Sequence, residues 1–146
     1  MKSWFLLLYL VHKILITPEI MTTKSKYQKV LDLGEKLNVK DGDVQEENGI
    51  LKIKGTTKTQ YEKNMLWDLI KEIGGQQPTD IKADIRVEDT SVYHRHVVKS
   101  GETLSKIAKH YYGDPMKYQA IFKANTDILK NPDLIHPNQE LIIPNL

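Results

Sequence analysis

Cysteine is absent from this chain of 146 residues, and the absence narrows its chemistry. We expect no disulfide, no thiol nucleophile, no thiolate metal site and no lipid-modified cysteine, and such a chain is compatible with a reducing cytoplasm. An excess of charge is also missing, because 21 Lys and Arg residues nearly balance 19 Asp and Glu residues. A balanced chain has no overall field that would favour nucleic acid or an anionic membrane as a partner.

Long hydrophobic runs are lacking as well. The prominent apolar run, WFLLLYLV at residues 4–11, is too short for a membrane span. Three interpretations of residues 1–20 stay open: an upstream extension that precedes a true start at Met21, a secretory signal or anchor, or a packed helix. The sequence TPEI at residues 17–20 makes a poor cleavage site for a signal. We therefore treat residues 1–23 as an N-terminal extension and expect membrane association only if residues 1–20 form an anchor.

The rest of the composition is that of a folded protein. With 40% hydrophobic and 27% charged residues, the chain is too apolar and too evenly charged to be disordered. Its length allows one ordinary domain or two small ones. Two blocks of patterned residues, joined by a polar stretch at residues 88–95, favour two.

The first block begins with a helical stripe of apolar residues at positions 27–37. Asn48-Gly49 follows as the strongest two-residue hairpin signal in the chain. Residues 44–47 are a weak candidate for the strand before this turn, and LKIKG at residues 51–55 alternates as the strand after it. These features predict a helix followed by a β-hairpin.

The same block ends with a second helix and a third strand. Thr59 and Glu62 are spaced as a capping box, and residues 81–87 alternate apolar and polar positions as a strand. The block therefore predicts the order αββαβ, with two helices on one face of a small sheet. The core face of the second helix is predicted to contain Tyr61, Met65, Leu66, Leu69, Ile70 and Ile73.

The second block predicts the order βααβ. Residues 95–99 form a strand, and apolar positions at residues 104–111 form a helical stripe. Asp114-Pro115 provides a cap and a proline at the first position of another helix. Residues 141–143 close the block as its second strand.

Fixed positions in this block give it a family resemblance. Residues 96–108, HVVKSGETLSKIA, match the LysM opening pattern xVxxGDTLxxIA, and residues 131–144, NPDLIHPNQELIIP, match the closing pattern NPDxIxPGQxLxIP. Asn125 matches the middle of the motif. Asn138 replaces the usual glycine, and because asparagine tolerates the left-handed conformation we expect the turn to survive. The second block thus resembles the LysM family.

The first block resembles a BON domain, through NGILKIKG at residues 48–55 and the helix and strand that follow. A BON domain followed by one LysM domain in so short a chain resembles the small bacterial potassium-binding BON–LysM proteins. The resemblance implies an α+β protein of two small domains. It places a BON-like domain at residues 24–89, a linker at 90–94 and a LysM domain at 95–146.

The LysM resemblance implies a shallow groove between two loops that binds glycans containing N-acetylglucosamine, such as peptidoglycan. Backbone N–H and C=O groups would bond the N-acetyl amide, and small apolar side chains would contact its methyl group. The same residues could instead only build the fold, with Gly101 in a turn, Thr103 at a helix start and Ile135 in the core. The candidate glycan-binding residues are Ser100, Gly101, Glu102, Thr103, Leu104, Pro132, Asp133, Leu134, Ile135 and His136.

Side chains for metal binding or catalysis form no convincing pattern. His94 and His96 could share one face of a strand, but without cysteine or a His-x-x-x-His helix we expect hydrogen-bonded or solvated histidines. Nothing places a carboxylate pair across a cleft, and no G-x-S-x-G motif is present. We predict that the protein is not an enzyme. Trp67 and Tyr112 fall off the core stripes, so either could serve a partner surface if exposed.

Potassium binding follows from the two-domain resemblance alone. Potassium is a large, weakly hydrated ion that rings of backbone carbonyls can hold, so its site leaves almost no side-chain signature. The ligands are therefore unknown, and we would look for them near the interface of the two modules. Two functions stay open: a cytoplasmic potassium-binding or potassium-sensing protein, which we prefer, and an exported module that binds peptidoglycan. In either case we expect a monomer with no organic cofactor.

Overall fold

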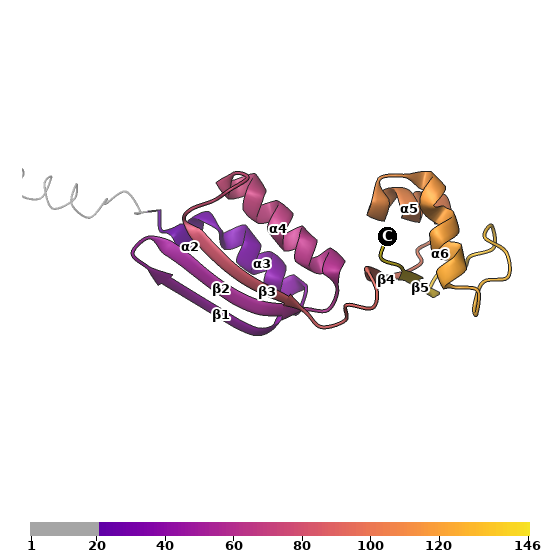
Figure 1. Ribbon diagram of the computed structural model, residues 1–146, viewed down its shortest axis with the longest axis horizontal. Helices are drawn as coiled ribbons and strands as arrows, with labels where there is room; N and C mark the ends of the chain where they lie inside the picture. The colour runs from indigo at the N-terminus through magenta and orange to yellow at the C-terminus, as the bar shows by residue number, and fades with distance from the viewer. Residues whose placement is uncertain (1–20) are drawn as a thin grey trace, which may run out of the picture.

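The computed structural model describes residues 21–146, so the interpretations of residues 1–20 lie outside the described residues. The fold is α+β, as predicted, with a three-stranded and a two-stranded sheet that each have their own hydrophobic core (Figure 1). We call residues 23–87 the first module and residues 94–143 the second module. Within residues 21–146, no helix is both long enough and apolar enough to cross a membrane.

The first module has the predicted order of elements. It contains α2 (Thr23–Lys26), α3 (Gln28–Lys36), β1 (Lys40–Glu47), β2 (Ile50–Thr57), α4 (Gln60–Gly74) and β3 (Ile81–Val87). The sheet has the order β1-β2-β3, with β1 antiparallel to β2 and β2 parallel to β3. Helices α3 and α4 lie over one face of this sheet (Figure 1). The predicted first helix is interrupted at Tyr27, which separates α2 from α3.

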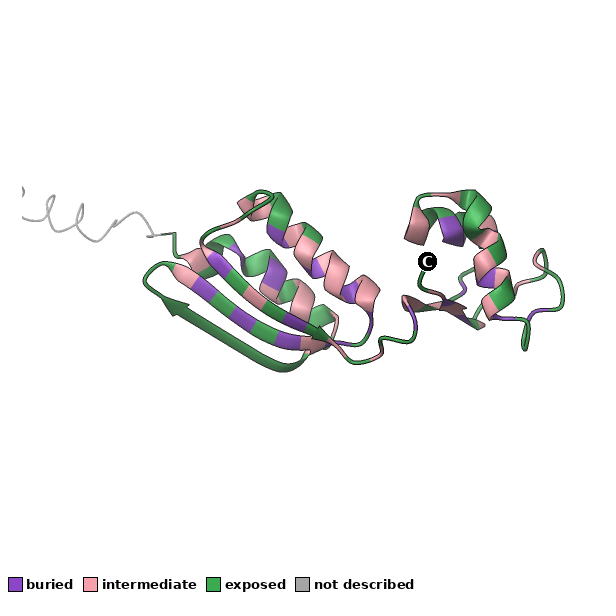
Figure 2. Ribbon diagram, in the orientation of Figure 1, coloured by how far each residue is buried: buried purple, intermediate pink, exposed green. Residues whose placement is uncertain are grey.

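The hairpin forms where the sequence predicted it. Asn48 and Gly49 both have positive φ, 53° and 75°, as a tight two-residue turn between twisted antiparallel strands requires. Both strands are longer than predicted: β1 starts at Lys40, and β2 continues past Gly55 to Thr57. Every residue of β1 is exposed (Figure 2), so hydrophobic alternation could not mark where this strand begins.

Helix α4 starts with the predicted cap. The Thr59 hydroxyl accepts a hydrogen bond from the Glu62 amide. The Glu62 carboxylate in turn accepts from the amide of Lys58 at 2.9 Å. Trp67, which falls off the predicted core stripe, is partly buried against the first core.

The second module contains β4 (His94–Val97), α5 (Leu104–Tyr112), the short 3₁₀ helix η1 (Pro115–Lys117), α6 (Tyr118–Ala124) and β5 (Glu140–Ile143). Strands β4 and β5 pair antiparallel, which confirms the order βααβ. Asn138 has φ 72°, the left-handed conformation expected of a residue that replaces glycine. Tyr112 is not exposed: it packs on the second core, and its hydroxyl donates to the carbonyl of Pro144 at 2.5 Å.

Candidate functional site

The first predicted loop, residues 100–104, connects β4 to α5. Gly101 adopts φ 83°, so the turn depends on a glycine there. The Glu102 carboxylate accepts from the Lys99 amide at 2.8 Å and lies 2.7 Å from His96 Nε2. Thr103 caps helix α5, and Leu104 is only 2% exposed. The Leu104 side chain therefore belongs to the core, and a ligand at this loop would meet mainly backbone and polar groups.

The second predicted loop, residues 132–136, precedes β5. Leu134 is 61% exposed, whereas Ile135 is partly buried against the second core. The amide of Asp133 donates to the Asn131 side chain at 2.8 Å, and the amide of His136 donates to the Gln139 side chain at 2.7 Å. Leu134 is the exposed apolar side chain that this loop offers to a ligand.

Pairing between the two strands holds the bases of these loops together. The Val98 amide donates to the Gln139 carbonyl at 2.9 Å, and the Asn138 amide donates to the Val98 carbonyl at 2.8 Å. Asn125, which is 1% exposed, bonds both backbone groups of Ile142 and so ties α6 to β5. The loops are thus mounted on a rigid base.

A second cluster, which the sequence reasoning missed, lies where the modules meet. The amide of Tyr61, in the first turn of α4, donates to the Tyr93 carbonyl at 3.1 Å. The Tyr61 hydroxyl lies 3.0 Å from His110 Nε2, and Thr59 Oγ1 lies 2.9 Å from His94 Nδ1. We call this set the inter-module junction: Thr59, Tyr61, Tyr93, His94, His110 and Tyr111.

Aromatic packing dominates the junction. The Tyr61 ring lies 4.8 Å from the ring centroids of both His94 and Tyr111, and 5.8 Å from that of Tyr93. Burial raises the pKa of Tyr61 and of Tyr111, so both phenols stay protonated. Tyr61 was predicted as a core residue of its own module, but its ring packs against the other one. No local pattern could distinguish these roles, because the contacting residues are more than thirty positions away.

Histidines were predicted to be hydrogen-bonded, and two of them alternate on β4. His94 and His96 lie on the same face, as predicted, opposite Ile143 and Leu141. His96 Nδ1 lies 2.8 Å from the Tyr111 hydroxyl. Burial, followed by the neighbouring His96 and His110, lowers the pKa of His94 to about 4. His94 is therefore neutral at physiological pH.

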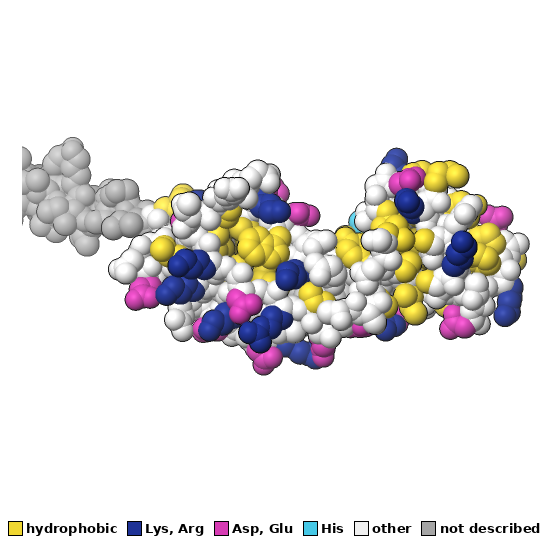
Figure 3. Space-filling model, viewed as in Figure 1, with side chains coloured by type: hydrophobic (Ala, Val, Ile, Leu, Met, Phe, Trp, Pro, Cys, Tyr) yellow, Lys and Arg dark blue, Asp and Glu magenta, His cyan; other side chains and the backbone are white. Residues whose placement is uncertain are grey.

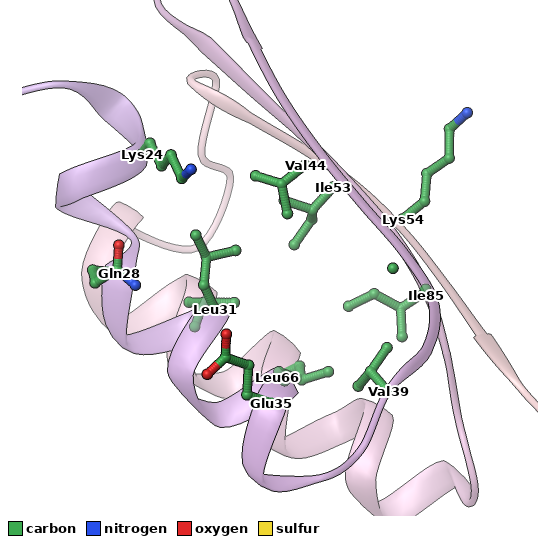
Figure 4. A pocket seen from close by; sticks show the side chains of 14 residues that line it. Lys24, Gln28, Leu31, Glu35, Val39, Val44, Ile53, Lys54, Leu66 and Ile85 are labelled. Carbon is green, nitrogen blue, oxygen red and sulfur yellow. The ribbon is translucent and has the colours of Figure 1, made fainter.

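The first module contains an apolar pocket of about 410 Å³ between helix α3 and the strands β1 and β2 (Figure 4). Lys24 and Glu35 lie at its edge, with the Glu35 carboxylate turned toward the pocket and Lys54 turned away (Figure 4). On the face of this module that Figure 3 shows, basic and acidic side chains are interspersed rather than gathered by sign. The apolar side chains of the pocket are Val30, Leu31, Val39, Val44, Ile53, Leu66 and Ile85.

Comparison with known proteins assigns a class to the second module. Residues 96–144 match the LysM domain family. An uncharacterized protein of Deinococcus radiodurans is 36% identical over 115 residues, which cover 70% of this chain but only 44% of that protein. The chain therefore spans less than half the length of this relative.

A second relative covers both modules. The potassium binding protein Kbp of Escherichia coli is 33% identical over 120 residues, which cover 80% of each chain. The chain belongs to the family of this protein. Family membership and the LysM domain together point to a binding protein rather than a catalyst.

Proposed function

We propose that this protein binds potassium without catalysing a reaction, and that its first module is a BON domain. In this proposal residues 24–89 form the BON domain, residues 90–94 the linker and residues 95–146 the LysM domain. The observation that carries the proposal is the 33% identity with potassium binding protein Kbp over 80% of both chains. A cytoplasmic location and a monomeric state belong to the same proposal.

Acidic and histidine side chains do not cluster as metal ligands in residues 21–146. Within this range no group of three or more His, Asp or Glu side chains could hold a metal. Nor does any buried side-chain nitrogen or oxygen of these described residues lack a hydrogen-bond partner. The proposed potassium site uses backbone carbonyls, whose oxygens can replace the hydration shell of this ion.

The junction is where we expected the ion from the sequence. Carbonyls in the junction and beside it already accept hydrogen bonds: that of Tyr93 from the Tyr61 amide, that of Ile143 from the Tyr93 amide and that of Pro144 from the Tyr112 hydroxyl. We therefore assign no potassium ligand to the junction.

A titration of the full chain with KCl tests the proposal, with NaCl at equal ionic strength as the control. A ligand that binds only the folded state stabilises it by about 2.7 kcal/mol at a hundredfold excess over Kd. We expect the melting temperature to rise with KCl and stay level with NaCl, and calorimetry to give a binding isotherm for KCl alone. Equal responses to the two salts would refute potassium-specific binding.

Peptidoglycan binding is the alternative, and the LysM match with the exposed Leu134 in a predicted loop favours it. The ten candidates are Ser100, Gly101, Glu102, Thr103, Leu104, Pro132, Asp133, Leu134, Ile135 and His136. This function would require an exported protein. Sedimentation with purified peptidoglycan tests it, using Leu134→Ala and the control Met116→Ala, whose side chain is 67% exposed in the same module. Binding that Leu134→Ala alone weakens would establish the loops as the site, and no sedimentation would exclude this function.

A further inference from the structure

His94 of β4 connects the second module to helix α4 at the inter-module junction. Thr59 Oγ1 already accepts the hydrogen bond from the Glu62 amide that caps helix α4. The same hydroxyl lies 2.9 Å from His94 Nδ1, a hydrogen bond across the junction whose direction depends on the tautomer of the ring. A neutral ring can accept the Thr59 proton at Nδ1, and a protonated ring loses this ability because both of its nitrogens carry hydrogen.

The surroundings of His94 also oppose a positive charge. Thr59 is the N-cap of α4, a helix of 15 residues, and the N-terminus of a helix carries the positive end of its dipole. From β4 and α5, the nearby titratable groups are His96, His110 and Tyr111, none of which carries a negative charge at neutral pH. His94 itself is half-buried between the modules.

Carboxylates near the junction are already engaged. On α4, the Glu62 carboxylate accepts a hydrogen bond from the Lys58 amide at 2.9 Å. On the loop before α5, that of Glu102 contacts His96 Nε2 at 2.7 Å. In residues 21–146 no carboxylate lies within salt-bridge distance of His94, so no partner would compensate its charge when it takes up a proton.

We propose that the junction is a pH-sensitive contact: protonation of His94 releases helix α4 from the second module while both modules stay folded. Each module can remain folded because its core is separate, with Leu66 and Ile70 in the first and Ile107 and Ile121 in the second. Released His94 gains solvent, which stabilises the charged ring. This inference does not depend on potassium binding, because it uses only contacts between the two modules.

The direction of the effect follows from proton uptake. The pKa of His94 is lowered from 6.5 to about 4 in the docked state, so the released state binds more protons between these values. Docking is therefore strongest above pH 6.5 and weakens as the pH falls toward 4. Each pH unit in this window increases the equilibrium constant for release by up to about tenfold. The increase is smaller to the extent that solvent already reaches the half-buried ring in the docked state.

Distance measurements between two spin labels test this proposal on the full chain. Because the protein has no cysteine, Lys71→Cys and Lys123→Cys place one label on an exposed position of each module. We expect one narrow distance distribution at pH 7.5 and a broad one at pH 5.0. His94→Asn keeps an oxygen acceptor near the position of Nδ1 but cannot be protonated, so we expect a narrow distribution at both pH values. His136→Asn, on an exposed loop, should behave as the unsubstituted chain does.

Two results would overturn the proposal. One is a distribution that does not change between pH 7.5 and 5.0 in the unsubstituted chain. The other is a pH response that His94→Asn retains or that disappears instead in His110→Asn. If His94→Asn is already released at pH 7.5, an NMR titration of the His94 ring in the unsubstituted chain decides: a pKa well below 6.5 supports the proposal, and a pKa of 6.5 or above refutes it.

Discussion

Replacement of Asn125 tests how the second module is held together. This side chain is 1% exposed and makes three hydrogen bonds. Its Nδ2 donates to the carbonyls of Ile121 and Ile142 at 2.7 and 2.8 Å, and its Oδ1 accepts from the Ile142 amide at 2.8 Å. Asn125→Ala removes all three bonds and leaves the backbone groups of Ile142 without these partners.

Asn125→Ala should remove a large part of the free energy of unfolding of so small a module. A hydrogen bond contributes about 0.5–1.5 kcal/mol net, so three of them contribute about 3 kcal/mol. Folded proteins are stable by roughly 0.05–0.15 kcal/mol per residue, which gives a module of this size only a few kcal/mol in total. We therefore expect Asn125→Ala to unfold the second module in a substantial fraction of molecules at 25 °C.

Amide hydrogen exchange followed by NMR measures this loss one module at a time. Leu141 and Ile143 report on the second module, and Leu51 and Ile53 report on the first, whose protection should change little. Asn131→Ala is the control, because Asn131 is exposed and its side chain accepts a single loop hydrogen bond, from the Asp133 amide. The reasoning fails if Asn125→Ala lowers the protection of Leu141 and Ile143 by less than about 1 kcal/mol, the value of a single hydrogen bond, or by no more than the control does.

Two further substitutions test the first module, each by urea unfolding. Gly74→Ala would place a methyl group against the hydroxyl of Tyr27, a side chain that is fully buried. We therefore expect the free energy of unfolding to fall by about 1–3 kcal/mol. Gly42→Ala is the control and should cost far less, because no atom lies within 4 Å of the added methyl group. Asp80→Asn weakens the hydrogen bonds from Lys26 and Tyr27 that lower the pKa of this carboxyl group, so we expect a loss of about 0.5–1.5 kcal/mol at pH 7. Because a lowered carboxyl pKa stabilises the fold only above the unfolded value of about 3.9, this difference should fade as the pH falls below 4, and a difference that grows there would contradict it.

Local patterns in the sequence determined the elements and much of their detail. Asn48-Gly49 specified the hairpin, Thr59 and Thr103 specified two helix starts, and Asn138 specified the turn before β5, because each acts on backbone within a few residues of itself. The alternation of Leu51 and Ile53 identified the core face of β2 for the same reason. The predicted α+β class and the LysM motif followed from these local features.

Tertiary structure alone decided how the modules contact each other and which side chains are left exposed. Strand β1 extends back to Lys40 because it pairs with β2, not because its residues alternate. Trp67 and Tyr112 lie off the helical stripes but are partly buried against the two cores. The contacts of Tyr61 and Thr59 with Tyr93, His94 and Tyr111 join residues that are 32 to 50 positions apart. The burial that lowers the pKa of His94 arises at the same junction. Such contacts depend on the packed arrangement of whole elements, which no short stretch of sequence encodes.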